Sequence, residues 1–315
     1  AHYPQGLLSC LYQLKSQLPF DFDLVSHGNE RRCAMRHLDR LEKNDVVVYD
    51  RGYFSYPLLH RHCTTGIHAI FRLQECSATV IQEFFSSPQP DTEVIIDPSP
   101  RARADIHKQY PDLDIVPLKM RLLKYDIAGR TFCLGTTLVA AQHRYPLQEF
   151  MEVYHGRWGI EELYKISKHI FVVEDFHAKT ERGVKQELFA HFVLVTMNRL
   201  FANRADTELN PGQTATAFDP DDSSSRDPST AAMPGRKTNF KNCAHVLERC
   251  LEELLLLHQR MQGVVQRVFR AIVARHQRIR PNRSYPRRSM RPETKWYPSK
   301  EKKRDQKVAV SLVSA

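Results

Sequence analysis

A run of β-branched residues, Asp45-Val-Val-Val-Tyr-Asp50, constrains the fold of this chain more than any other stretch. Three valines in a row, with no polar residue between them, are typical of a strand buried on both faces in an α/β sheet. Around it we predict strands at 6–14 and 18–25, a helix over 30–41, a helix over 56–62 and a strand at 68–73. This order of elements belongs to an α/β domain.

The rest of the chain divides by composition. Six prolines lie between positions 88 and 117, and strands are expected at 93–96, 116–125 and 131–138, with one helix at 79–85. We therefore interpret 74–146 as a β-rich insertion between two parts of one domain, 1–73 and 147–204. Residues 205–238, rich in Pro, Ser, Thr and Asp, are predicted to be a disordered linker. Residues 239–315 are expected to form a helical and basic C-terminal region.

The charge of the chain is concentrated near its C-terminal end. The net charge is +10 with a pI near 9.3, and residues 258–307 hold sixteen Lys or Arg against three acids. A basic segment on a nearly neutral body indicates a polyanionic partner, nucleic acid first and an acidic membrane second. No apolar run approaches the roughly 18 residues that span a bilayer. Seven cysteines without a framework spacing suit a reducing compartment, so we expect a cytoplasmic protein that does not enter membranes.

The stretch from Tyr154 to Lys168 is the second informative feature. A helix turns about 100° per residue, which places Tyr154, Arg157, Glu161 and Lys168 on one narrow polar stripe. Apolar residues at 153, 160, 163, 166 and 170 fall on the opposite side. A carboxylate among a hydroxyl and two cations suits a metal ion at Glu161 with phosphates around it. The alternative is a solvated face with ordinary Glu–Lys pairing.

Asp50 is the natural partner of Glu161. A carboxylate at the end of a central strand can meet one from a neighbouring helix, and together they can bind divalent cations for phosphoryl transfer. Carboxylate oxygens prefer Mg²⁺ or Mn²⁺ to softer metals. The alternative for Asp50 is a strand-end residue that opens a turn.

These motifs resemble a known family. Asp50-Arg-Gly-Tyr is similar to the second acidic motif of bacterial insertion-sequence transposases of the DDE type. Tyr154, Arg157, Glu161 and Lys168 match the Tyr-(2)-Arg-(3)-Glu-(6)-Lys signature of one subgroup. The similarity continues through Asn29-Glu-Arg, residues 121–138 and Arg283-Ser-Tyr-Pro-Arg287.

The resemblance implies an RNase H-like catalytic domain interrupted by a β-rich insertion. It also implies three carboxylates that hold two Mg²⁺ ions, nick transposon ends and join them to target DNA. The expected assembly is a homodimer in a synaptic complex, located in the bacterial cytoplasm at the nucleoid. By the same resemblance Asp50 and Glu161 are catalytic metal ligands, and the expected DNA contacts are Tyr154, Arg157, Lys168, Arg51, Arg283 and Arg287.

One departure from the family concerns the first acid. In the family it lies on an opening strand, before two further strands and a helix. Here those strands begin at Gly6, so the opening strand is expected to fall before Ala1. A triad of Asp50, Asp97 and Glu161 would need two strands and then a helix between Asp50 and Asp97, whereas the sequence offers a helix, a strand and a helix. Asp97 is therefore rejected as a substitute. Asp21 and Asp23 are poor substitutes because they lie on what should be the third strand of the fold.

We therefore expect an N-terminally truncated transposase that is inactive alone. The alternative is a DNA-binding or dimerising remnant that inhibits transposition. A third possibility, a general basic nucleic-acid binder, predicts no preference for element ends.

Several smaller features are weaker indications of function. His60, His62, Cys63 and His68 match no standard zinc spacing. Cys243 and Cys250 are expected to be small apolar residues on one helical face. Trp158 is either a core or a DNA-facing residue. Some relatives stack a flipped base on a Trp in the insertion, and Tyr125 or Phe132 would have to take that place here.

Overall fold

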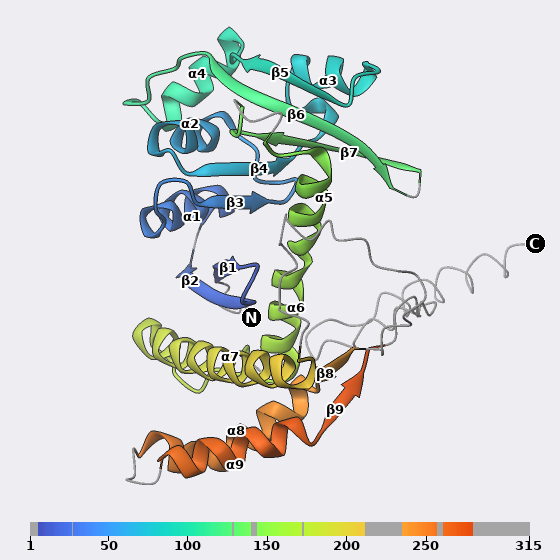
Figure 1. Cartoon of the computed structure of the whole chain (residues 1–315). Coiled ribbons are helices and arrows are strands. Elements are labelled where there is room, and N and C mark those ends of the chain that lie inside the picture. Colours follow the sequence, from blue (N-terminus) through green and yellow to red (C-terminus); the bar gives the residue numbers. More distant parts are fainter. Residues whose placement is uncertain are drawn as a thin grey trace, which may run out of the picture.

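The structure, a computed structural model, describes residues 6–26, 28–127, 129–139, 144–171, 173–211, 235–256 and 261–279. Its centre is a five-stranded sheet in the order β3-β4-β7-β6-β5 (Figure 1). The strands are β3 (Val46–Tyr49), β4 (His68–Arg72), β5 (Asp91–Ile96), β6 (Leu118–Ile127) and β7 (Arg130–Thr136). β3 and β4 run parallel, and the other neighbouring pairs are antiparallel.

Helices cover both faces of this sheet. Because side chains alternate along a strand, Ala69 and Phe71 of β4 point to one face and Ile70 points to the other. The first face packs against α1 (Glu30–His37), α2 (Tyr56–Thr65), α3 (Thr79–Ser86) and α4 (Pro100–Gln109), with two short 3₁₀ turns, η1 (Leu38–Arg40) and η2 (Glu75–Ser77). The second face packs against α5 (Leu147–Gly156). The result is a three-layer α/β arrangement.

A second, two-stranded sheet lies apart from the first. Its strands, β1 (Leu7–Gln13) and β2 (Leu18–Val25), form an antiparallel hairpin. On one side His37 of α1 ties the hairpin, since its Nδ1 lies 2.7 Å from Asp21 Oδ2 and its Nε2 lies 3.1 Å from Ser9 Oγ. On the other side Phe22 stacks on Phe192 of α7 (Glu181–Leu209), with ring centroids 4.2 Å apart. The hairpin is therefore held between α1 and α7.

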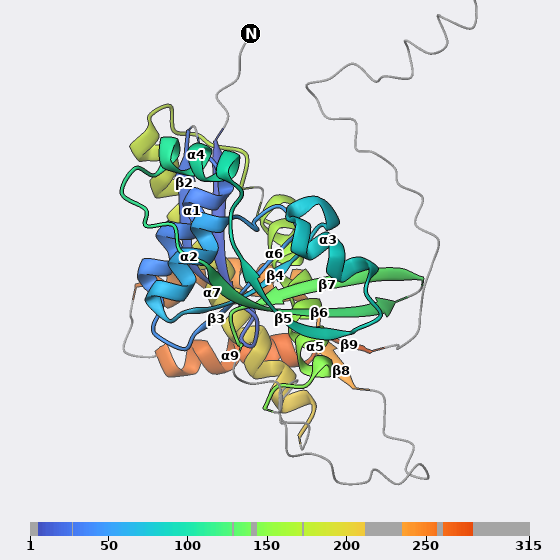
Figure 2. The same ribbon diagram turned by 90° about the horizontal axis from the view of Figure 1, so that it is seen from above.

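The remaining elements extend the molecule away from the five-stranded sheet. After α5, α6 (Trp158–His169) continues in nearly the same direction and leads to α7, which crosses below it (Figure 1). Beyond α7 lie α8 (Phe240–Leu255) and α9 (Met261–Val273), which share an apolar core with it, and the short strands β8 (Arg236–Thr238) and β9 (His276–Arg278). Seen from above, the long β6–β7 hairpin projects away from α1 and α2 (Figure 2).

Most of the predicted elements are confirmed, but some of them differ from the prediction. The predicted insertion is continuous with the core sheet, because β7 pairs directly with β4, and it contains the unpredicted helix α4. Helix α7 continues to Leu209, into the predicted linker, because its buried Ala202 and Ala205 pack on α8 and α9. Most of that linker and the basic segment from 280 onward lie outside the described residues. Within the described ranges, no helix is long and apolar enough to cross a membrane.

Candidate active site

Asp50 leaves the end of β3 in a tight turn. The backbone N–H of Tyr53 donates to the Asp50 carbonyl at 3.1 Å, which closes the turn. Arg31 of α1 donates through Nε to the carbonyl of Gly52 at 2.9 Å and so fixes the loop from the other side. The Asp50 side chain remains 45% exposed. The carboxylate is thus held at the sheet edge but is accessible from solvent.

The helix that carries Glu161 is interrupted at Arg157. We predicted one continuous helix through Tyr154–Lys168, and this is wrong: α5 ends at Gly156, and α6 begins at Trp158. Two glycines, Gly156 and Gly159, flank the break and lower the helix propensity there. Gly159 also allows a close approach, because a Cβ at this position would lie 2.8 Å from the ring and the hydroxyl of Tyr12.

Three members of the predicted stripe nevertheless converge on Asp50. Tyr154 Oη donates to Asp50 Oδ1 at 3.3 Å. Arg157 Nη1 lies 3.2 Å from Glu161 Oε1 and 3.7 Å from Asp50 Oδ2, so a single nitrogen lies close to both carboxylates. Tyr154 is only 2% exposed and joins a core cluster against the sheet, so this member of the polar stripe does not belong to a solvated face.

Burial and charge act together on these groups. Burial raises the pKa of Tyr154 above its ordinary value, and the negative charge of Asp50 raises it further. Burial disfavours the charged form of Arg157, but Asp50, Tyr154 and Glu161 outweigh it and raise the Arg157 pKa. Tyr154 therefore remains a hydrogen-bond donor and Arg157 remains a cation at neutral pH.

The fold and this geometry agree with the comparisons with known proteins. A family model described as a transposase DDE domain matches residues 2–197. The chain belongs to the insertion-sequence DDE transposases. It is 27% identical over 201 residues to the transposase InsG for insertion sequence element IS4 of Escherichia coli (strain K12). That alignment covers 63% of this chain and 44% of the relative, so the chain spans less than half the length of that protein. The mixed α/β sheet is compatible with the RNase H-like domain of a transposase.

Two of the other predicted DNA-binding residues of this DDE transposase, Lys168 and Arg51, belong to the described part of the chain. Lys168 is half exposed and pairs with Glu174, with Nζ 2.6 Å from Oε1. Arg51 is exposed in the turn directly after Asp50. Arg283 and Arg287 lie outside the described residues. The roles of all four in DNA binding stay predictions.

The prediction missed Arg72, at the end of β4. Its guanidinium lies 4.6 Å from the ring centroid of Phe132 and is close enough to Tyr154 to lower the pKa of that phenol. It adds a second cation near Tyr154. No sequence signal distinguishes Arg72 from other arginines at strand ends, because only the pairing of β4 with β7 brings Phe132 next to it.

The rejected substitutes for the first acid are engaged elsewhere. Asp97 follows β5, at the opposite edge of the sheet from β3, and pairs with Arg103. Asp21 and Asp23 of β2 pair with residues of α1. Across the described part of the chain, no three His, Cys, Asp or Glu side chains form a group that could hold a metal ion. Asp50 and Glu161 are the two carboxylates that the described residues bring to Arg157.

Three of the remaining candidates, His62, Cys243 and Tyr125, are buried, and Trp158 is exposed. His62 is buried and uses both ring nitrogens in hydrogen bonds, so it is not arranged to bind zinc. Cys243 is fully buried in the apolar core of α7, α8 and α9, as predicted. Trp158 is 56% exposed, which decides against a core role. Tyr125 is buried and stacks on Phe132, with centroids 5.4 Å apart.

Proposed function

We propose that this chain is part of the catalytic domain of an insertion-sequence transposase and acts on the DNA ends of the element with Mg²⁺ or Mn²⁺. The observation that carries this proposal is the convergence of Asp50 and Glu161 on one nitrogen of Arg157. Two carboxylates from different elements meet at a point where positive charge is stabilised. Oxygen donors of this kind suit hard divalent cations.

Each residue has a chemical task in this proposal. A divalent ion, when bound, would activate a water or hydroxyl group and stabilise the leaving oxygen in phosphoryl transfer. Asp50 and Glu161 supply its carboxylate ligands. Tyr154, which donates to Asp50 Oδ1, orients that carboxylate so that its second oxygen is left for the cation. Arg157 offsets the negative charges of the two carboxylates before DNA binds. Its guanidinium can then bind a phosphate of the DNA through two parallel hydrogen bonds.

The cations around the carboxylates support a DNA substrate. Arg157 lies close to both carboxylates, and Arg72 lies near Tyr154. Arg51 is exposed in the adjoining turn, and Lys168 is half exposed further along α6. Contacts of this kind to phosphate position a duplex without reading its sequence. Arg157→Gln should therefore weaken binding to all DNA sequences and make it less sensitive to salt. Fluorescence anisotropy at several salt concentrations measures both effects.

Metal binding by the pair is the direct test. Titration with Mn²⁺, followed by electron paramagnetic resonance, should detect a weak site that Asp50→Asn and Glu161→Gln each weaken by tenfold or more. Glu162→Gln is the matched control, since Glu162 is an exposed neighbour that pairs with Lys165 at 2.6 Å. Equal Mn²⁺ affinity in Glu161→Gln and Glu162→Gln would contradict the assignment.

We further propose that the chain does not cleave DNA by itself, because its described residues bring two carboxylates together rather than three. Incubation with Mg²⁺ and supercoiled DNA that carries element ends should give no nicking above that of Asp50→Ala. Nicking at an element end that Asp50→Ala abolishes would overturn the inactivity but support the transposase assignment.

The same observation favours a second function, the inhibition of transposition. A chain with its basic groups in place and an incomplete acid set would occupy element ends without cutting them. It should then lower the transposition rate of an active transposase of the same element when both are mixed. The inhibition should weaken in Arg157→Gln and persist in Asp50→Asn. Loss of inhibition in Asp50→Asn alone would contradict this mode of action.

A further inference from the structure

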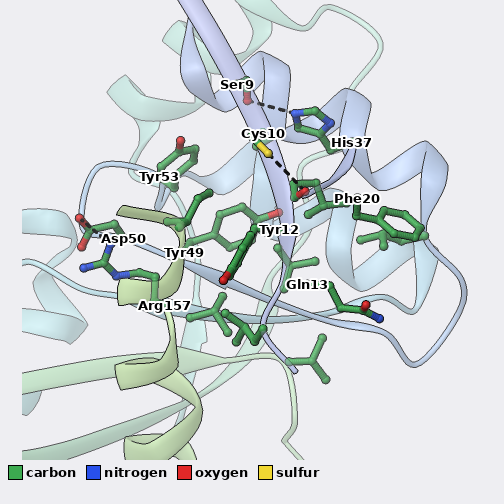
Figure 3. A pocket seen from close by; sticks show the side chains of 18 of the residues that line it. Ser9, Cys10, Tyr12, Gln13, Phe20, His37, Tyr49, Asp50, Tyr53 and Arg157 are labelled. Carbon is green, nitrogen blue, oxygen red and sulfur yellow. Dashed lines mark hydrogen bonds and ion pairs between the residues drawn. The ribbon is translucent and has the colours of Figure 1, made fainter. Parts of the chain in front are cut away.

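The five-stranded sheet ends in two edge strands with different surroundings. A cavity of about 590 Å³ lies between β3 and β1, and Figure 3 shows Tyr12, Tyr49 and Asp50 at its wall. The β3 edge therefore faces the β1–β2 hairpin. β5 forms the opposite edge (Figure 1) and pairs only with β6 among the described strands. We call the outer side of Asp91–Ile96 the β5 edge. Strand edges present N–H and C=O groups that readily accept another strand, so the β5 edge is a candidate interaction surface.

The hydrogen-bond pattern determines which backbone groups of β5 point outward. The N–H of Lys124 donates to the carbonyl of Pro90 at 2.7 Å, so these two residues form a hydrogen-bonded pair between β5 and β6. Such pairs alternate with non-hydrogen-bonded pairs along an antiparallel ladder, and the register of residues 91–96 with β6 is unbroken. The N–H and C=O groups of Glu93 and Ile95 therefore point away from β6. They have no backbone partner among the described residues.

The β5 edge lacks two of the devices that usually protect an edge strand. Natural sheets protect their edges with bulges, prolines or charges. The pairing of β5 with β6 contains no bulge, and residues 91–96 contain no proline. Ile95 is 57% exposed, and Asp91 is already paired with the buried Arg121. Glu93 is therefore the charge that a neighbouring strand would meet.

A second copy of β5 fits this edge in one register. Two copies related by a two-fold axis present the same patch to each other and pair antiparallel. Only residues with outward backbone groups can form the hydrogen-bonded pairs, so the register changes in steps of two. If Glu93 lies opposite Ile95 of the second copy, Val94 lies on the axis. The neighbouring registers place Glu93 opposite Glu93 or Asp97 of the second copy, and like charges directly opposite are destabilising.

The favoured register also brings apolar groups and opposite charges together. The Ile95 side chains of the two copies become diagonal neighbours across the axis, within reach of each other. In its own sheet Ile95 lies opposite the exposed Lys119 of β6. Lys119 of one copy therefore lies two strands from Glu93 of the other, on the same face. Two strand spacings are about 10 Å, which a lysine and a glutamate side chain can span together.

We propose that the β5 edge binds the β5 edge of a second copy of this chain and so joins two five-stranded sheets into one continuous sheet. The assembly closes at two copies, because each copy contributes its β5 edge once. It needs neither DNA nor the carboxylates Asp50 and Glu161, so it is independent of the proposed function. A single pair of short strands buries less than a standard interface of about 1,600 Å². We therefore expect a weak dimer, with a dissociation constant of roughly 10–100 µM.

Sedimentation velocity of the full chain without DNA tests the dimer. Between about 1 and 200 µM, which spans the expected dissociation constant, the chain should change from monomer to dimer. Ile95→Pro removes an N–H that points outward and leaves the hydrogen bonds to β6 intact. This variant should remain folded by circular dichroism and should dimerise at least tenfold more weakly.

A charge exchange tests the register. Glu93→Lys and Lys119→Glu should each weaken the dimer at least fivefold, because each places like charges near one another across the axis. The double variant should recover most of the wild-type affinity. Glu252→Lys makes the same change in net charge at an exposed position on α8 and should leave the dimer unchanged.

Hydrogen exchange measured by mass spectrometry needs no substitution, so it decides the question even if a variant fails to fold. Residues 91–97 should exchange several-fold more slowly at high than at low chain concentration, and residues 46–49 of β3 should not change. A chain that stays monomeric at about 200 µM overturns the proposal. So does a dimer that a folded Ile95→Pro leaves intact, protection of β3 in place of β5, or a double variant no better than the single ones.

Discussion

His62 makes the stability of the fold depend on pH. Its side chain is 1% exposed, and Nδ1 lies 2.8 Å from the carbonyl oxygen of Ile67 while Nε2 lies 2.9 Å from the hydroxyl of Tyr49. Because a carbonyl can only accept, Nδ1 carries the proton and Nε2 accepts from Tyr49. Burial lowers the pKa of His62 from 6.5 to about 4. Protonation at Nε2 would remove the lone pair that accepts from the hydroxyl of Tyr49, the residue directly before Asp50.

The size and sign of the effect follow from this pKa. The folded state holds the proton less tightly than the unfolded state, so the stabilising contribution is complete above pH 6.5 and is lost as the pH falls toward 4 and below. A shift of about 2.5 units at 1.36 kcal/mol per unit corresponds to about 3 kcal/mol. Between pH 7 and pH 4 the wild-type chain should therefore lose about 3 kcal/mol of unfolding free energy through His62 alone.

Urea unfolding at pH 7, 6, 5 and 4, followed by circular dichroism, measures this loss. Carboxylates also titrate in this range, so the decisive quantity is the difference between the wild type and His62→Gln, which carries no titrating ring. The variant should be less stable at pH 7 but should lack the extra loss of about 3 kcal/mol. His107→Gln, at an exposed position on α4, is the control and should keep the full pH dependence. Equal slopes in the wild type and His62→Gln would refute the reasoning.

Two further changes test how the site is supported. Arg121 is 1% exposed and makes a two-pronged ion pair with Asp91 at 2.9 and 2.6 Å, so Asp91→Ala should leave a buried charge and cost about 3 kcal/mol in urea unfolding. Asp39→Ala removes an exposed pair and should cost less than about 1 kcal/mol; similar losses in both variants would contradict the argument. Gly159→Ala should displace the Tyr12 ring, whose pKa burial raises to about 12, and bring that pKa back toward 10 in an ultraviolet titration. An unchanged titration would show that the ring and the helix tolerate the methyl group.

The local pattern was sufficient for most elements of the fold. Each predicted strand of the sheet appears, because β-branched runs and alternating residues specify an extended backbone without reference to their partners. The pairing of β7 with β4 was not predictable from such patterns. Strand pairing depends on contacts between segments far apart in the chain, so the sequence pattern did not show that strands of residues 74–146 join the same sheet as β4.

For the site, the sequence indicated which residues belong together but not how they are arranged. The spacing of Tyr154, Arg157 and Glu161 and the position of Asp50 after a valine run predicted one shared site for these four residues. Only the tertiary structure decided that the helix breaks at Arg157, that Tyr154 is buried against Asp50, and that one nitrogen lies close to both carboxylates. A helical period places side chains on one face of one element, whereas the distance between two elements depends on how they pack. The cavity between β1 and β3 has the same origin, since residues from two separate strands line it and no single stretch of sequence predicts it.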